Sequence, residues 1–197
     1  MIKKLSFLFL CVFCVESFAH APHDEISDVF MISDNNSVFL YAISRSSLYL
    51  KSGDNSFKRL VKGLDNTQFL QRLAMTKAGE KILFLTSAGD GVYISSDLGN
   101  SWRKSNSGLS NPELYLIEPS KYRPGFVLTC GLSGGLYYSV NNGDSWQEFV
   151  EFNSKQITAI YESPEGYFFS DNQGSIFELD LKTLKSKEIF QLESQYG

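Results

Sequence analysis

The sequence predicts an all-β fold, a β-propeller of four-stranded antiparallel blades with about four blades present. Three observations support this prediction. A segment of a dozen residues returns 44 residues further along the chain. Each repeat contains four short segments rich in aromatic and β-branched residues, separated by turn residues. Strong helix signals are absent, and four-stranded units at a period of roughly 40–45 residues are typical of propeller blades.

Residues 91–102 and 135–146 carry the clearest copies of the repeat. Gly, Tyr, Ser, Gly, Ser and Trp recur at matching positions without a gap, and Asp97 is answered by Asn141. A β-sandwich with accidental similarity is the alternative, but identity at six spaced positions is hard to reach by chance. A repeat of this length indicates one small unit that is copied and stacked.

Residues 1–19 are predicted to be a signal peptide. Lys3 and Lys4 form a short basic region, residues 5–15 are almost wholly apolar, and small residues follow. The apolar stretch is shorter than the ~20 residues that a membrane-spanning helix needs. Cleavage after Ala19 is favoured over cleavage after Ala21, which would leave Pro22 beside the scissile bond. We therefore expect a secreted or periplasmic protein with a short linker at 20–25.

The remaining chain divides into four blades, approximately 26–66, 67–111, 112–154 and 155–197. The two central blades carry the clear repeat, and the outer two are divergent copies of it. The expected strands, four to a blade, are 26–33, 38–43, 47–51 and 56–61; 69–76, 81–87, 91–96 and 101–105; 114–118, 126–130, 135–139 and 145–149; and 157–162, 167–170, 175–179 and 185–190.

The repeated turn is expected to have a structural role. The oxygen of Asp97 can accept hydrogen bonds from backbone N–H groups two residues on. Gly99 supplies a left-handed position at little steric cost, and Ser101 can bond back across the hairpin. Trp102 then begins the outer strand and buries a large ring. The expected structural residues are Ser95, Asp97, Gly99, Ser101 and Trp102 in one copy and Ser139, Asn141, Gly143, Ser145 and Trp146 in the other.

The pattern Ser-x-Asp-x-Gly-x-Ser-Trp at 95–102, with Asn for Asp at 139–146, resembles the Asp-box or BNR repeat. Families that share this repeat include sialidases, xyloglucan-type glycoside hydrolases, sortilin-like receptor domains and photosystem II assembly-factor-like proteins. Residues 118–125, followed by Gly-Gly-Leu-Tyr at 134–137, look most like the non-sialidase repeats. The resemblance implies a propeller with the box on blade turns away from the ligand-binding face. It does not transfer an activity.

Charge and cysteine content exclude two classes of function. Without Lys3, Lys4 and Glu16, the 18 basic and 22 acidic residues become 16 and 21, a net charge of about −5. A nucleic-acid surface would need a basic excess instead. Cys130 is the one cysteine after residue 19, so we expect no internal disulfide and no thiolate metal site. It follows a strand-like run and is expected to be a small buried residue.

No catalytic set stands out in the sequence, and no cofactor or metal is expected. Sialidases hold their substrate with three arginines, and none of the five arginines here sits in the Arg-Ile-Pro pattern of that family. Two carboxylates ~5–10 Å apart would suffice for glycoside hydrolysis, but no spacing singles out a pair. The arginines are Arg45, Arg59, Arg72, Arg103 and Arg123, and the turn carboxylates considered are Asp90, Glu162, Glu165 and Asp171. His20 and His23 could chelate a metal at the processed terminus, although adventitious binding is the simpler interpretation.

The sequence favours an open half-propeller over a closed four-bladed ring, because a fifth first strand would begin where the chain stops. A partner copy could complete the ring, since end blades otherwise expose apolar faces and strand edges.

The expected function is a non-catalytic exported module that binds a protein or a glycan through its blade turns. The alternative is a fragment of a glycoside hydrolase whose catalytic carboxylates lie partly on missing blades. No nucleic-acid partner and no membrane span are expected.

Overall fold

A computed structural model describes residues 25–34, 37–53, 55–64, 69–76 and 79–193. The expected signal peptide, nearly all of the linker at 20–25, and both histidines lie outside the described residues. None of the helices in the described part has the length and apolar character needed to cross a bilayer.

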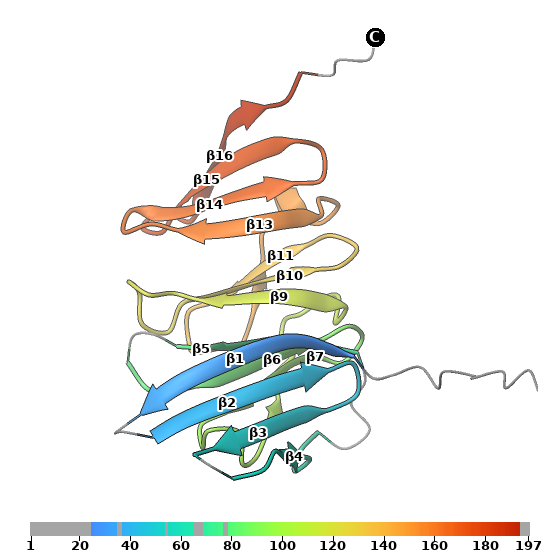
Figure 1. Cartoon of the computed structure of the whole chain (residues 1–197). Helices are drawn as coiled ribbons and strands as arrows, with labels where there is room; N and C mark the ends of the chain where they lie inside the picture. The colour runs from blue at the N-terminus through green and yellow to red at the C-terminus, as the bar shows by residue number, and fades with distance from the viewer. Residues whose placement is uncertain (1–24, 35–36, 54, 65–68, 77–78, 194–197) are drawn as a thin grey trace, which may run out of the picture.

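The described chain forms four antiparallel sheets of four strands each, which confirms the predicted all-β fold class (Figure 1). Each sheet takes its strands in chain order, so every sheet is a simple meander. Sheet 1 contains β1 (Ile26–Asp34), β2 (Ser37–Ser44), β3 (Leu48–Ser52) and β4 (Lys58–Leu60). Sheet 2 contains β5 (Leu70–Met75), β6 (Leu83–Ser87), β7 (Gly91–Ser95) and β8 (Arg103–Lys104).

The last two sheets repeat this plan. Sheet 3 contains β9 (Leu114–Pro119), β10 (Val127–Gly131), β11 (Leu136–Ser139) and β12 (Gln147–Glu148). Sheet 4 contains β13 (Ile157–Glu162), β14 (Gly166–Asp171), β15 (Ser175–Asp180) and β16 (Lys185–Gln191). A short 3₁₀ helix, η1 (Val150–Phe152), links sheets 3 and 4. Figure 1 shows the sheets one after another, with sheet 1 and sheet 4 at opposite ends.

The hydrophobic core lies between consecutive sheets. Side chains alternate across each strand, so every sheet has two faces. We call the face that packs on the preceding sheet the rear face; in sheet 2 it includes Leu73, Leu85 and Tyr93. The forward face packs on the following sheet, and in sheet 2 it includes Phe84 and Ile94.

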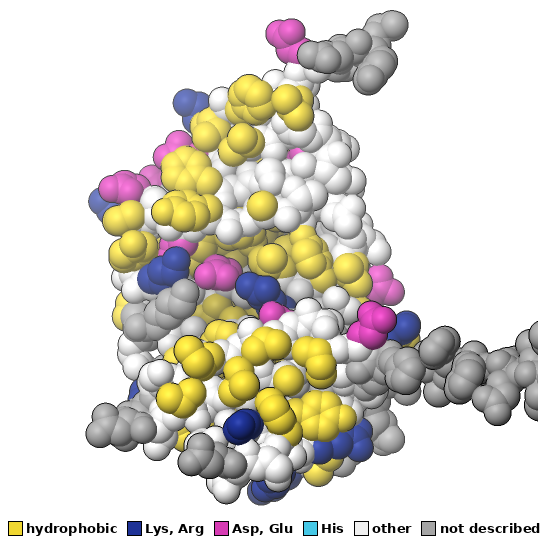
Figure 2. All heavy atoms as spheres, in the orientation of Figure 1, with side chains coloured by type: hydrophobic (Ala, Val, Ile, Leu, Met, Phe, Trp, Pro, Cys, Tyr) yellow, Lys and Arg dark blue, Asp and Glu magenta, His cyan; other side chains and the backbone are white. Residues whose placement is uncertain are grey.

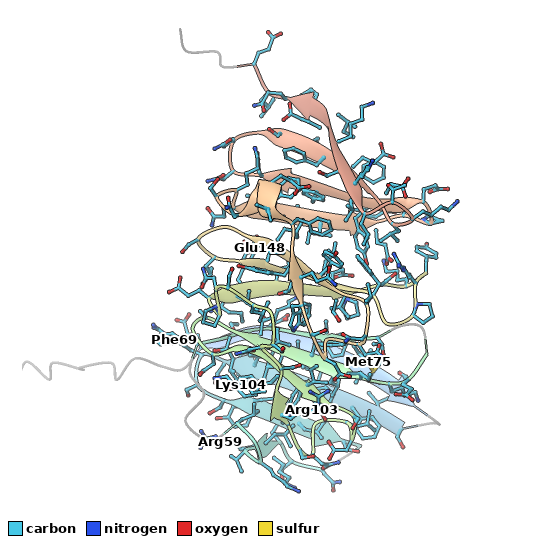
Figure 3. All side chains as sticks on the ribbon, turned by 180° about the vertical axis from the view of Figure 1, so that it is seen from behind. Arg59, Phe69, Met75, Arg103, Lys104 and Glu148 are labelled. Atoms are coloured by element: carbon cyan, nitrogen blue, oxygen red, sulfur yellow. The ribbon has the colours of Figure 1, made fainter. Side chains whose placement is uncertain are left out.

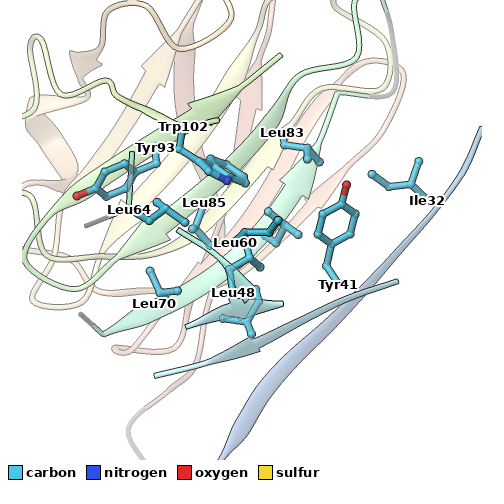
Figure 4. Close-up of a cluster of buried hydrophobic side chains, with 12 residues drawn as sticks. Ile32, Tyr41, Leu48, Leu60, Leu64, Leu70, Leu83, Leu85, Tyr93 and Trp102 are labelled. Atoms are coloured by element: carbon cyan, nitrogen blue, oxygen red, sulfur yellow. The ribbon is translucent and has the colours of Figure 1, made fainter. Parts of the chain in front are cut away.

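Three buried clusters fill the three spaces between the sheets. Figure 4 shows the first of them, in which Tyr41 and Leu48 of sheet 1 pack with Leu85, Tyr93 and Trp102 of sheet 2. Burial of this apolar surface is the main force that holds the sheets together.

The outer strands are shorter than expected in the two central sheets. The sequence predicts strands at 101–105 and 145–149, whereas β8 and β12 have two residues each. The reason is local. The amide of Ser101 bonds to the Asp97 side chain, and that of Trp102 bonds to the Lys62 carbonyl. Trp102 therefore closes the turn one residue before the strand and does not begin it, and Trp146 does the same before β12.

Candidate functional site

The turn between β7 and β8 is closed by two side chains. Ser95 Oγ accepts hydrogen bonds from the Asp97 and Gly99 amides at 3.3 and 2.8 Å. Asp97 Oδ1 accepts from the Ser101 amide at 2.9 Å, and Ser101 Oγ donates to Asp97 Oδ2 at 2.6 Å. The expectation that Asp97 accepts from an amide two residues on is therefore wrong. The amide that donates to Asp97 belongs to Ser101, four residues on. The amide two residues on, that of Gly99, donates to Ser95 Oγ instead.

Asn141 closes the turn between β11 and β12 with a different proton donor. Gly143 N donates to Ser139 Oγ at 2.8 Å, and Ser145 N donates to Asn141 Oδ1 at 3.0 Å, as in the first copy. The bond between the two side chains is reversed, because Asn141 Nδ2 donates to Ser145 Oγ at 2.9 Å. An amide thus replaces a carboxylate with the same geometry and no charge.

Each of these turns rests on the preceding sheet. Gly99 has φ +83°, and a Cβ built on it would lie 3.4 Å from the Tyr41 ring of sheet 1. The Tyr41 hydroxyl donates to the Leu98 carbonyl at 2.8 Å. In the second copy, a Cβ on Gly143 would meet Phe84 of sheet 2 at 2.8 Å. The glycines therefore allow close contact between sheets as well as the turn itself.

The tryptophan side chains are buried and their indole N–H groups are bonded. Trp102 Nε1 donates to the Gly99 carbonyl at 3.0 Å, within its own turn. Trp146 Nε1 donates to the Ser105 carbonyl of the preceding sheet at 2.8 Å. Ser105 Oγ in turn donates to the Gly143 carbonyl. The second turn is thus tied to sheet 2 by polar bonds as well as by packing.

Two glycines outside the repeated motif allow the chain to pass close to the backbone of the two tryptophans. The comparison of the two motif copies does not identify them. Gly63 and Gly108 have φ +83° and +89°. A Cβ on Gly63 would lie 1.9 Å from the Trp102 carbonyl oxygen, and one on Gly108 would lie 2.0 Å from that of Trp146. The available signal was a Gly-Leu pair that recurs 45 residues apart, at 63–64 and 108–109.

The four turn carboxylates considered for catalysis are each engaged by a neighbouring donor. Glu162 is buried and accepts from the Ser120 hydroxyl and, at 2.8 Å, from the Lys121 amide. It joins β13 to the turn that follows β9. Glu165 accepts from the Ser163 hydroxyl at 3.1 Å.

Asp171 and Asp90 occupy equivalent turns, between the second and third strands of their sheets. Asp171 accepts from the Gln173 and Ser175 amides, each at 2.9 Å, and pairs with Lys155 at 3.0 Å. Burial alone would raise the pKa of Asp171, but these hydrogen bonds outweigh it and lower the pKa below its ordinary value. Asp90 pairs with Lys104 at 3.0 Å.

The five arginines do not converge. Arg45 lies over the Phe69 ring, Arg72 lies near Asp28, Arg103 pairs with Asp144, Arg123 bonds to the Leu181 carbonyl, and Arg59 lies on β4. Figure 3 shows Arg59, Arg103 and Lys104 in different places on the outer strands. The described chain thus has no arginine cluster for a carboxylate substrate.

Cys130 is fully buried in β10, and burial raises its pKa to about 12. A thiol in this environment is not a nucleophile at neutral pH. Across the described ranges, no group of three or more His, Cys, Asp or Glu side chains is placed to hold a metal ion.

Three surface depressions offer room for a ligand. The first, of about 310 Å³, lies beside the two repeated turns and is lined by Glu80, Arg103 and Asp144 among others. The second, of about 180 Å³, lies along the innermost strands and is lined by Asp28, Arg72 and Glu118 among others. The third, of about 450 Å³, lies at the turns of sheets 3 and 4. Its lining residues are Tyr122, Arg123, Pro164, Leu181 and Lys182, and we call it the turn pocket.

The turn pocket combines an exposed aromatic ring with two cations. Tyr122 is 53% exposed, and Arg123 is held by its bond to the Leu181 carbonyl and its position over the Phe126 ring. No carboxylate lines the pocket. Such a surface suits a ligand that offers a flat apolar face and hydrogen-bond acceptors.

No family model and no curated protein sequence matches the chain. Solved β-propellers are similar in structure. The GH74 xyloglucanase from Xanthomonas campestris has a TM-score of 0.63 at 15% identity, over 87% of this chain and 31% of that chain. YCF48 bound to a D1 peptide has a TM-score of 0.58 at 17% identity, over 78% of this chain and 50% of that chain.

A third similar structure is a catalytically inactive virginiamycin B lyase from Staphylococcus aureus with quinupristin. Its TM-score is 0.62 at 13% identity, over 88% of this chain and 58% of that chain. The chain thus spans less than two thirds of the length of each of these proteins. At such identities the likeness concerns the fold alone, which is that of a β-propeller.

Proposed function

We propose that the protein is an exported, non-catalytic β-propeller module that binds a protein or a glycan through its blade turns. We also propose that the turns at 95–102 and 139–146 are Asp-box turns with a purely structural role. The observation that carries the binding proposal is the turn pocket, whose lining combines exposed Tyr122 with cationic Arg123 and Lys182.

The chemistry of the turn pocket favours recognition over catalysis. A tyrosine ring can stack on a sugar or on an apolar side chain, and its hydroxyl remains available to solvent. Arg123 and Lys182 can donate to carbonyl, carboxylate or hydroxyl oxygens of the ligand. General acid–base chemistry would need a carboxylate or a histidine within reach, and the pocket lining has neither.

The location of the turn pocket departs from what the Asp-box resemblance implies. In a meander, the turn after the first strand and the turn after the third lie at the same end of the sheet. The pocket and the repeated turns therefore share one end, whereas the resemblance puts ligands at the other. The proposed location of the ligand therefore rests on the residues that line the turn pocket of this chain, and not on the Asp-box resemblance.

The binding proposal can be tested by screening the purified protein against glycan and peptide arrays, followed by calorimetry on the hits. Tyr122→Ala should weaken binding of a hit by about tenfold or more, because one aromatic anchor often carries this much. Phe57→Ala is the matched control, since Phe57 is also exposed but lies away from the pocket. Equal affinity of Tyr122→Ala and the parent for every hit would rule out the turn pocket.

A fragment of a glycoside hydrolase is the second candidate, because GH74 enzymes are among the similar structures. That function would use an acid and a base ~5–10 Å apart, partly from residues beyond this chain. Release of reducing ends from xyloglucan by this chain, lost in Glu165→Gln or Asp90→Asn variants of normal stability, would favour the hydrolase. Binding of a glycan without turnover would favour the binding module.

A further inference from the structure

The two end sheets each present one apolar face to solvent. On the rear face of sheet 1, Val29 is 58% and Met31 is 64% exposed. On the forward face of sheet 4, Tyr161 is 68% and Phe190 is 50% exposed. Figure 2 shows the first of these faces as a group of apolar side chains over β1–β3. Exposed apolar surface of this kind marks an interaction site.

The rear face of sheet 1 matches the rear faces that are buried elsewhere in the chain. Paired residues across a sheet lie on one face, and the row across sheet 1 is Val29, Ala42 and Tyr49. The equivalent rows are Leu73, Leu85 and Tyr93 in sheet 2, and Ile160, Phe169 and Phe177 in sheet 4. Leu73 is 1% and Phe177 is 6% exposed, because each packs on the preceding sheet.

The forward face of sheet 4 matches the buried forward faces in the same way. Its rows are Tyr161, Phe168 and Glu178, and Ala159, Ser170 and Ile176. The row equivalent to Tyr161, Phe168 and Glu178 in sheet 2 is Ala74, Phe84 and Ile94, which is buried against sheet 3. The two open faces are therefore the two halves of the kind of interface that the chain forms three times internally.

We propose that two copies of this chain pack head to tail, with the forward face of sheet 4 of each on the rear face of sheet 1 of the other. A twofold axis makes the two contacts equivalent, so the dimer closes one continuous ring of sheets with no open face. This proposal does not depend on the ligand of the turn pocket.

The charges at the two faces support a heterologous contact between unlike faces. Lys51 and Arg59 lie on the rear face of sheet 1, and the described rear-face residues of that sheet include no carboxylate. Glu178 stands on the forward face of sheet 4, where sheets 1 and 2 have Leu50 and Ile94. Its cross-strand neighbour is Lys187, and Asp180 faces Lys185 on the same face, so the forward face of sheet 4 has no net charge. Two copies of the sheet 1 face placed together would instead oppose cation to cation.

The dimer is tested by the molar mass of the purified protein in solution, measured by light scattering over a range of concentrations. The parent should have twice the mass of one chain. Met31→Asp, on sheet 1, and Tyr161→Asp, on sheet 4, should each be monomeric and fully folded, because both side chains are exposed within one copy. Val150→Asp is the matched control, since Val150 is 71% exposed in η1, outside both faces, and this variant should remain dimeric.

Mixing the two monomeric variants distinguishes the head-to-tail contact from others. A mixed dimer would have one contact with both substitutions and one contact with neither, so mixing should restore a dimer with weakened affinity. If Tyr161→Asp alone stays dimeric, sheet 1 packs on sheet 1 and the proposal is wrong. A parent protein that stays monomeric at every concentration would also overturn it.

Discussion

Asp97 and Asn141 hold equivalent positions and differ in charge. Although partial burial would raise it, hydrogen bonds from Ser101 and Ser95 keep the pKa of Asp97 below its ordinary value. Asn141 makes the corresponding bonds without a charge. The geometry of the acceptor oxygen, more than its charge, therefore closes these turns.

Substitution of Asp97 should affect stability and leave ligand binding intact. Asp97→Ala removes the acceptor for the Ser101 amide, and we expect it to lower the free energy of unfolding by about 1 kcal/mol, a typical loss for a cap. Asp97→Asn should be close to the parent, because Asn141 performs the same role in the second copy. Urea unfolding measures both. A binding defect in a normally stable Asp97→Ala variant would contradict the structural role.

Asp171 should make stability depend on acid pH. Its pKa in the folded protein is lower than its ordinary value of 3.8. Its contribution to folding is therefore complete above about pH 4 and is lost as the pH falls through the lower folded pKa. Asp171→Asn should cost roughly 1–3 kcal/mol at pH 7, with a smaller difference at the acid end of the series. Unfolding curves from pH 2 to 7 check this, and a constant difference would contradict it.

For single residues, the sequence predicts the local role of a side chain better than its hydrogen-bond partners. The positions of Gly99, Gly143 and the buried Cys130 follow from the pattern, because left-handed turns and strand ends restrict residue choice locally. The hydrogen-bond partners of the Glu162 and Arg123 side chains do not, since they lie 41 or more residues away in sequence. Contacts of this kind depend on how the sheets are placed.

The strands themselves are largely predictable because the same four-strand pattern occurs in each of the four sheets. Sequence reasoning places strands at 91–96 and 157–162, and the structure has Gly91–Ser95 and Ile157–Glu162. It overextends the outer strands at 101–105 and 145–149, where turn closure and contacts with the preceding sheet take up the backbone amides. The periodicity of the sequence predicts strands. It does not show where a backbone amide bonds to a side chain or to another sheet instead of to the neighbouring strand.

The links between sheets are expected to be sensitive to added volume. Gly108→Ala places a Cβ 2.0 Å from the Trp146 carbonyl oxygen at φ +89°. We expect a loss of roughly 2–4 kcal/mol, from the left-handed backbone together with the clash. Gly53→Ala is the control, because Gly53 also has positive φ (+60°) but has nothing within 4 Å of the added carbon. Thermal unfolding of both variants separates the clash from the backbone cost, and equal losses would contradict the contact.

For the whole molecule, one packing rule accounts for the three buried clusters. Each sheet lays its rear face on the forward face of the sheet before it, and the central turns reinforce the contact. The sequence repeat predicts that such stacking exists. It does not predict the turn pocket, because Tyr122 and Lys182 come from turns of different sheets that diverge from the repeat.

The contact between each turn and the preceding sheet can be observed directly by NMR. Nuclear Overhauser effects should link the Gly99 Hα protons to the Tyr41 ring, and the Gly143 Hα protons to the Phe84 ring, because these groups touch across the sheets. Both pairs combine residues more than 50 positions apart in sequence, so no local structure can produce the signal. If all four residues are assigned and neither cross-peak is seen, sheets 1 to 3 do not pack on one another through these turns.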